Sequence, residues 1–553
     1  MALKRAGWLA CGGVALWYLF AWAMLRPLAD APVADSWLYG EAVRRYLQTG
    51  EVRFAGYTQA MPIAQVYYGA AWARLFGGGS ASLEIADVVL AALGAMMFYA
   101  LARRCGATPI PSLIATGCLL GNPCYNFLSF SFMTEIPFLM LVIAVNLAFA
   151  EGEGRFEALW MWLAAILSVV CFMIRPFAAM TVLGCVAAIV LYGSGVLREH
   201  PFDLMRMVRG LFPFAVASAT CVGIWFWQMV LNPRPWDLER NLNHFGFLFQ
   251  VPISTYLRAG VLGPLIYLGT VLSPIALLQF IGERRRQTIA WAIAIFGSTL
   301  FLSFIDHRLP VTPEYSCFGG WDNVMILRGL PNRFYWNGDW QYFWMALGSA
   351  GAAGLIVAAR DLIPRLGRAP SAIMIAAIVY WLAIVPLWFF NDRYYVVMVP
   401  AGCLLLALTP WPKLRVAPML AGALTLILMM LSLGGTYAYQ RGLLAVTSVR
   451  DALEREGVRR SAIDAGYSLN GNDLYRYPKH GIDSMKLEAG IPMITSPGVD
   501  EYTLASAPIA GTQIVSRFSW PGPFGLGSRE LYVLKKAHAY QAGAAPAKTQ
   551  PRF

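Results

Sequence analysis

The stretch Asp30–Phe76, DAPVADSWLYGEAVRRYLQTGEVRFAGYTQAMPIAQVYYGAAWARLF, follows an apolar segment that runs roughly from Trp8 to Leu25. At 1.5 Å per residue, a helix of about 20 residues is long enough to cross a bilayer. The polar loop that begins at Asp30 therefore starts at a membrane surface, and it carries carboxylates there.

Within this loop the sequence predicts two short helices that lie in the membrane interface. From Asp35 to Gln48 the apolar residues form one helical stripe and the charged residues take the other side, which is typical of an interfacial helix. Gly50 is placed to end it, because glycine tolerates the left-handed cap conformation. We expect a second, more apolar helix from Met61 to Phe76.

The composition predicts a polytopic membrane protein. The chain has 553 residues, of which 58% are hydrophobic and 13% charged, far from the soluble average. The first apolar segment is long enough to be a retained helix rather than a signal peptide. The formal charge of +12 is spread over short basic clusters between apolar spans, so it does not indicate nucleic-acid binding. The nine cysteines show no metal-ligand spacing, and only Cys124 and Cys317 fall in loops where they could pair.

Apolar runs predict about 13 membrane-spanning helices. They lie at roughly 8–27, 83–101, 109–125, 135–150, 158–174, 177–193, 211–231, 258–281, 288–305, 341–359, 371–390, 394–410 and 416–436. Every second connection is basic, which places the N-terminus in the cytoplasm. The long connections 28–82, 232–257 and 306–340 then face outward, as does the tail from 437.

The composition divides the chain into three parts. Residues 1–436 form the expected transmembrane domain, and residues 437–540 read as a small extracytoplasmic α/β domain. In the latter, VTSVRDALEREGV predicts a helix, while TQIVSRFSW and ELYVLKK predict strands. Residues 541–553 have the composition of a disordered tail.

Two carboxylates are candidates for chemistry. Asp35 opens the first interfacial helix, where it is placed to act as a general base on an acceptor hydroxyl; the alternative is that it only caps the helix. Asp30 is a weaker candidate, and Glu41 is expected to be solvated. Glu135, in the sequence TEIP, stands at the outward mouth of a predicted span, where an ionisable residue indicates function; alternatively, Thr134 caps this helix and Glu135 favours its dipole.

Two arginines at the outward ends of spans are candidates for binding an anion. Arg175 precedes Pro176 and needs a partner, either Glu135 or a phosphate, unless it extends to the lipid headgroups. Arg393 lies in the sequence NDRYY beside Tyr394 and is a second phosphate candidate. Acidic residues and histidines in the loops 232–257 and 306–340 leave a divalent cation open, although no spacing specifies one.

The order and common sidedness of these elements resemble the GT-C superfamily of membrane glycosyltransferases, nearest to the protein O-mannosyltransferase and aminoarabinose transferase types. The resemblance covers about residues 1–436 and rests on the early Asp35, the TEIP element, Arg175-Pro176 and Asp392-Arg393-Tyr394. Many relatives carry an acidic pair where this chain has Asp35-Ser36. Members of the aminoarabinose transferase type share the predicted number of spans and the outer C-terminal domain.

The resemblance implies an inverting transfer of a sugar from a polyprenyl-phosphate donor to an extracytoplasmic acceptor, which would be a glycolipid, a polysaccharide or a protein. It implies that Asp35 is catalytic, and that the protein lies in the bacterial inner membrane with its C-terminal domain in the periplasm. Arg175 and Arg393 would bind the donor phosphate, and Glu135 and Tyr394 would orient groups in the site. In some branches a divalent cation assists. The alternative function is a transporter or lipid flippase, for which we would expect internal repeats.

Overall fold

The computed structural model describes residues 2–52, 54, 62–153, 156–194, 204–231, 251–306, 327, 339–385, 392–474 and 501–536. The predicted loops 232–257 and 306–340 lie largely outside these residues, as do Cys317 and the tail 541–553. The expectations that rest on them therefore stay predictions.

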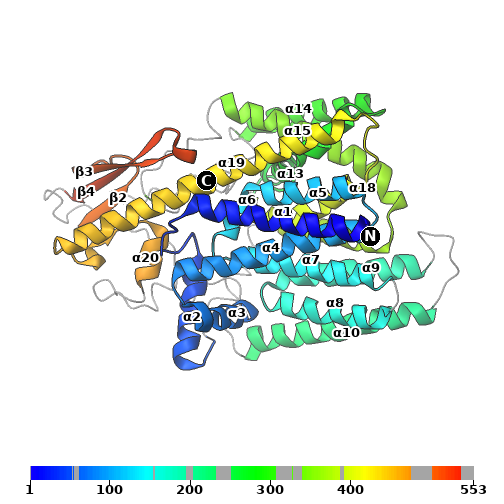
Figure 1. Ribbon diagram of the computed structural model, residues 1–553, viewed down its shortest axis with the longest axis horizontal. Helices are drawn as coiled ribbons and strands as arrows, with labels where there is room; N and C mark the ends of the chain where they lie inside the picture. The colour runs from blue at the N-terminus through cyan, green and yellow to red at the C-terminus, as the bar shows by residue number, and fades with distance from the viewer. Residues whose placement is uncertain are drawn as a thin grey trace.

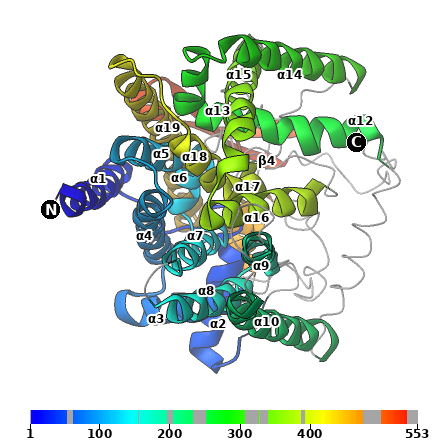
Figure 2. The same cartoon turned by 90° about the vertical axis from the view of Figure 1, so that its right-hand side faces the viewer.

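A bundle of long helices makes up most of the molecule, and most of them run along its long axis (Figure 1). On one side lie α1 (Ala2–Leu25), α4 (Ser80–Arg104), α7 (Glu135–Glu151), α8 (Glu157–Phe172), α9 (Ala179–Gly193) and α10 (Leu204–Phe226). The others are α5 (Pro109–Gly121), α13 (Gly263–Ala276), α14 (Arg285–Asp306), α15 (Asp339–Leu362), α16 (Arg368–Ile384), α18 (Val399–Leu408) and α19 (Val416–Arg455). Figure 2 shows the bundle end-on.

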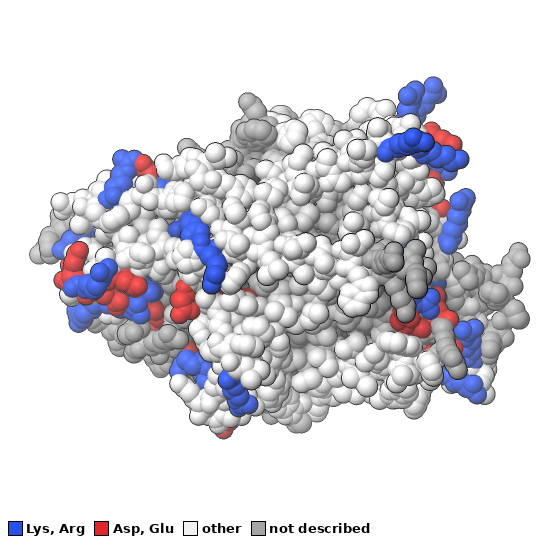
Figure 3. Space-filling view, in the orientation of Figure 1, with Lys and Arg blue, Asp and Glu red and all other residues white. Residues whose placement is uncertain are grey.

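The surface of this bundle fits a bilayer. Eight of the described helices are long and apolar enough to cross a membrane, and large apolar side chains such as Trp8, Phe301 and Met419 are exposed along them. Charged side chains gather toward the two ends of the long axis and leave a broad uncharged band between them (Figure 3). Because an ionised side chain is costly inside hydrocarbon, this band is where lipid would lie. The predicted count of 13 spans stays a prediction.

The two short helices predicted in the first loop form, while their position in the membrane interface stays a prediction. They are α2 (Ser36–Thr49) and α3 (Ile63–Phe76), and Gly50 ends α2 with φ 74° in the left-handed region. The expectation that Glu41 is solvated is wrong. Its carboxylate is 9% exposed and accepts hydrogen bonds from Arg44 and Arg45 at 2.6 to 2.7 Å, so the charged side of α2 is internally paired.

Two predicted spans are interrupted. The span at 109–125 ends at Gly121, and Asn122 then caps the short helix α6 (Pro123–Ser129) by accepting a hydrogen bond from the N–H of Tyr125 at 2.8 Å. The span at 394–410 begins as α17 (Asp392–Tyr395), tightens into a 3₁₀ turn, η10 (Val396–Met398), and continues as α18. Pro123 and Pro400 stand at these breaks, because proline has no N–H for the helical ladder.

The predicted C-terminal strands also form. A four-stranded sheet has the order β1-β2-β4-β3, from β1 (Ile463–Asp464), β2 (Tyr502–Ala505), β3 (Thr512–Pro521) and β4 (Ser528–Lys536). β1 and β2 are parallel, and the other pairs are antiparallel. The short helix α20 (Tyr467–Leu474) follows β1. The predicted boundary at 437 falls inside α19, which continues from the bundle to the sheet (Figure 1).

Shorter 3₁₀-, π- and α-helical segments complete the described elements. They are η1 (Pro176–Ala178), η2 (Trp227–Leu231), α12 (Ile253–Thr255), η4 (Tyr256–Leu262), η5 (Leu277–Phe280), η8 (Ile363–Arg365), η11 (Arg460–Ala462) and η12 (Pro523–Gly525).

Candidate active site

Asp35 stands at the N-terminal end of α2 and does not cap it. Its side chain makes no capping hydrogen bond to the helix, so the capping alternative is wrong. Instead, Oδ2 accepts a hydrogen bond from Nη1 of Arg393 at 2.8 Å, and Oδ1 accepts one from the hydroxyl of Tyr467, also at 2.8 Å. Asp35 is 8% exposed. Two donors therefore hold a nearly buried carboxylate in one orientation.

Tyr467 comes from the opposite end of the chain, at the start of α20. Asp464 and Asn470 shape the turn before this helix, because Asp464 accepts hydrogen bonds from the side chain of Asn470 and from the N–H of Gly466. α20 then packs on α2, where the rings of Trp37 and Tyr467 meet edge to face at 6.1 Å. A Cβ atom at Gly471 would lie 2.3 Å from the ring of Trp37. Glycine is therefore required for this close approach.

Glu135 and Arg175 form a buried ion pair beside this carboxylate. Glu135 is the first residue of α7 and is fully buried, and its Oε1 lies 2.6 Å from Nη2 of Arg175. Nε of Arg175 donates to Oγ1 of Thr134 at 2.7 Å, while Thr134 makes no capping bond. The side chain of Arg175 is only 12% exposed. It therefore does not extend to the headgroups, and the capping role of Thr134 is also wrong.

Arg393 joins the two carboxylates. Besides its bond to Asp35, its Nε lies 3.9 Å from Oε1 of Glu135, and its guanidinium lies 5.3 Å from the centre of the Tyr394 ring. We call Asp35, Glu135, Arg175 and Arg393 the charge cluster. Its members come from four segments that are far apart in the sequence, at the ends of α2, α7, α8 and α17.

The surroundings fix the protonation states around the cluster. Burial, followed by the charges of Glu135 and Asp35, raises the pKa of Tyr39, so this tyrosine stays a neutral phenol. Burial alone would lower the pKa of the Arg175 guanidinium, but the charge of the Glu135 carboxylate outweighs the opposing effect of Arg393 and leaves that pKa raised. The cluster thus holds two carboxylates against two permanently charged guanidiniums.

The structure brings together the four charged residues that the sequence singled out, and it places Tyr394 next to them. Sequence reasoning missed Tyr467, because no sequence signal near DAGYSLNG says that this segment returns to the start of the chain. Asp30 lies apart from the cluster, and its Oδ1 accepts a hydrogen bond from the N–H of Ala81 at 3.1 Å.

The described residues do not form a metal centre. Within the described parts of the chain no group of three or more His, Cys, Asp or Glu side chains could hold an ion. The acidic residues and histidines of the loops 232–257 and 306–340 lie largely outside those parts. We therefore assign no step to a divalent cation.

Comparison with known proteins gives a loose structural likeness. No family model matches the chain, and no curated protein matches it. The structure is similar to ArnT. The apo form of ArnT from Cupriavidus metallidurans has a TM-score of 0.41 and 15% identity, over 95% of this chain and 98% of that one. The form bound to undecaprenyl phosphate has a TM-score of 0.40 and 13% identity, over the same shares.

A second likeness is to the archaeal oligosaccharyltransferase AglB from Archaeoglobus fulgidus, in complex with an inhibitory peptide and a dolichol-phosphate. The TM-score is 0.39 and the identity 14%, over 81% of this chain and 58% of that one. At these scores no residue's role follows from the likeness.

Proposed function

We propose that this chain is an inverting glycosyltransferase that moves a sugar from a polyprenyl-phosphate donor to a hydroxyl group of an extracytoplasmic acceptor. The observation that carries the proposal is the carboxylate of Asp35, held by Arg393 and Tyr467 at the start of an interfacial helix. The setting would be the bacterial inner membrane, with the N-terminus in the cytoplasm and the C-terminal sheet in the periplasm.

The position of the charge cluster suits a lipid-linked donor. A sugar on a polyprenyl phosphate cannot leave the membrane, so its anomeric carbon must be met at the depth of the headgroups. Along the chain, α2 lies between the first membrane-spanning helix, α1, and the next one, α4. Asp35 stands at the N-terminal end of α2. A base at this point reaches a donor in the bilayer and an acceptor arriving from outside.

The chemistry requires one base and one anion site, and the charge cluster offers both. As the acceptor oxygen bonds to the anomeric carbon, its proton passes to Asp35. The bond from the anomeric carbon to the phosphate oxygen breaks on the opposite side, and its electron pair leaves with the polyprenyl phosphate. Arg393 and Arg175 stabilise the charge that builds on this leaving group. Glu135 holds Arg175 in place, at 2.6 Å.

Donor binding would also prepare the base. In the structure each oxygen of Asp35 accepts one hydrogen bond, so Arg393 competes with an acceptor hydroxyl for Oδ2 although lone pairs remain on both oxygens. A phosphate presents several oxygens to a guanidinium and would draw Arg393 from Asp35. Tyr467 would continue to hold Oδ1, and Oδ2 would then face the acceptor hydroxyl.

The direct test uses the purified full-length chain. Given a radiolabelled polyprenyl-phosphate sugar and an extract of envelope glycolipids and glycoproteins, it should release polyprenyl phosphate and label a component of the extract. Heat-inactivated protein is the control. If the labelled donor only moves between the leaflets of vesicles and no sugar is transferred, the protein is a lipid flippase and not a glycosyltransferase.

Tyr467→Phe is expected to slow transfer without weakening donor binding. It removes one hydrogen bond to a charged group, which is worth about 1.5–3 kcal/mol, so we expect kcat to fall roughly tenfold or more while the donor KM stays close to that of the wild type. Tyr502→Phe, in β2, is the matched control and should leave both constants unchanged. Equal kcat values for Tyr467→Phe and the wild type would remove this residue from the site.

A further inference from the structure

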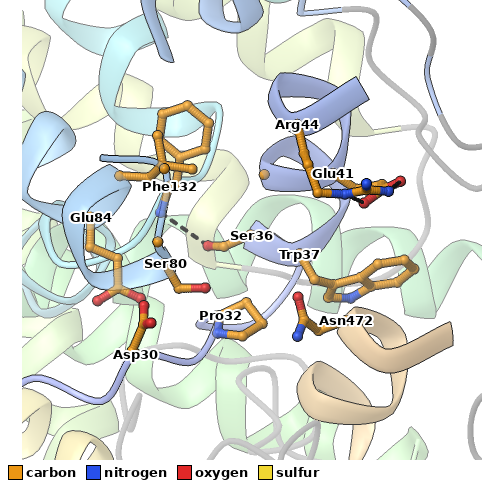
Figure 4. A pocket seen from close by; sticks show the side chains of 14 residues that line it. Asp30, Pro32, Ser36, Trp37, Glu41, Arg44, Ser80, Glu84, Phe132 and Asn472 are labelled. Atoms are coloured by element: carbon orange, nitrogen blue, oxygen red, sulfur yellow. Dashed lines mark hydrogen bonds and ion pairs between the residues drawn. The ribbon is translucent and has the colours of Figure 1, made fainter. Parts of the chain in front are cut away.

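A polar pocket lies beside the charge cluster, between the N-terminal ends of α2 and α4 (Figure 4). Its volume is about 110 Å³, and its wall includes Asp30, Ser36, Trp37, Glu84 and Asn472. None of the four cluster residues lines it. Ser36 directly follows Asp35, so the pocket is one residue away from the proposed base.

Glu84 is the unusual residue of this pocket. It lies in the first turns of α4 and is 1% exposed, yet neither of its carboxylate oxygens has a hydrogen-bond partner of good geometry among the described residues, although the side-chain amide of Gln440 is near it. In Figure 4 its carboxylate points toward that of Asp30. One turn further along the helix, Asp87 is fully buried, and its oxygens have no hydrogen-bond partner of good geometry among those residues, although the backbone of Met133 is near them.

The charges in the pocket do not balance. Arg44 is in the wall, but its guanidinium is held by Glu41 and by Gln48, at 2.6 to 2.8 Å. In the described parts of the chain no lysine or arginine pairs with Asp30 or Glu84. Asp30 is exposed and Glu84 is buried. Two carboxylates that face each other repel, and the buried one is costly unless a positive group or hydrogen-bond donors compensate it. The pocket therefore lacks one cation that carries donors.

We propose that this pocket binds a primary ammonium group, and that the acceptor of the transfer reaction carries it. An ammonium supplies one positive charge and three N–H donors, which suits the two open oxygens of Glu84 and the facing carboxylate of Asp30. The ring of Trp37 in the wall adds the aromatic surface that favours cations. A metal ion fits less well, because no group of three acidic, histidine or cysteine ligands exists among the described residues.

The site also explains how an acceptor would be held for reaction. An ammonium anchored between Asp30 and Glu84 would fix the acceptor beside Ser36, so that a hydroxyl elsewhere on the same molecule could reach Asp35. The proposal of an ammonium site depends only on the residues of the pocket. Its assignment to the acceptor rests on the proposed function.

Binding is tested with 2-aminoethanol, using the full-length protein in a sugar-based detergent and an amine-free phosphate buffer. Saturation-transfer NMR should detect binding to the wild type. The dissociation constant should rise at least about tenfold in Glu84→Gln, since a hydrogen bond to a charged group is lost. Asp30→Asn should weaken binding less, and Glu501→Gln, an exposed position on the outer sheet, should not change it. Thermal unfolding of each variant checks that it is folded.

Two ligands control for chemistry. Ethylene glycol matches 2-aminoethanol in size without the charge, and tetramethylammonium has the charge without N–H donors; neither should bind. Equal binding of 2-aminoethanol to wild type and Glu84→Gln, or equal binding of ethylene glycol, would overturn the ammonium site. Neither result bears on whether the chain transfers sugar.

The acceptor assignment is tested in the transfer assay with the envelope extract. 2-Aminoethanol should inhibit transfer by the wild type, and more extract should relieve the inhibition, whereas more donor should not. Relief by donor, or inhibition that extract does not relieve, would overturn the acceptor assignment while leaving the pocket and the transfer activity in place.

Discussion

Asp35→Asn is expected to fold normally and to lose nearly all sugar transfer. Asparagine has almost the same shape, and its side-chain oxygen can still accept a hydrogen bond from Tyr467, which lies 2.8 Å from Oδ1 in the native site. It cannot take the acceptor proton. Removing a general base typically costs 10²–10⁴ in rate, so we expect kcat to fall by about a thousandfold.

Donor binding separates this loss from a folding defect. Arg393 loses its carboxylate partner in Asp35→Asn, so its guanidinium is more available to a phosphate, and the donor should bind as tightly as before or more tightly. Equilibrium binding of a labelled donor measures this. Asp451→Asn, at a half-exposed position near the end of α19, is the control and should keep full activity. Turnover of Asp35→Asn near the wild-type rate would exclude Asp35 as the base.

The helices could be predicted because their signals are local. The stripe from Asp35 to Gln48 and the glycine after it determine α2, and its left-handed end at Gly50 forms as expected. The interruption after Gly121 was harder to predict, since an apolar run does not show where a proline breaks the ladder. The sequence also did not predict that α19 continues through residue 437, because a change in composition need not end a helix.

The charge cluster could be predicted only in part. The alternation of basic and non-basic connections predicted that Asp35, Glu135, Arg175 and Arg393 lie at one membrane face. Ionisable residues at the ends of spans are rare, so they indicate a functional site. Their pairing depends on the tertiary structure, because Arg393 and Asp35 are 358 positions apart in the sequence. The contribution of Tyr467 needs α20 to fold back on α2, and the position of Glu84 in a polar pocket opposite Asp30 can be recognised only in the folded structure.

Arg175→Ala is expected to reduce both stability and turnover. Glu135 is fully buried, and without Arg175 it faces Arg393, whose Nε is 3.9 Å from its Oε1. Breaking a buried ion pair by removing one partner typically costs about 3–5 kcal/mol. The midpoint of thermal unfolding in detergent should therefore drop, and the donor should bind more weakly because a guanidinium that faces its phosphate is gone.

A double variant separates the structural role of Arg175 from its functional one. Arg175→Met combined with Glu135→Leu replaces the ion pair by apolar groups of similar volume, which is often neutral or stabilising. The unfolding midpoint should recover while transfer does not. Arg368→Ala is the matched control, because Arg368 is similarly buried at 13% and pairs with Glu153 and Glu157. It should lower the midpoint but leave turnover per folded molecule unchanged. Recovery of transfer in the double variant would mean that Arg175 and Glu135 only support the fold, and that Arg393 alone meets the phosphate.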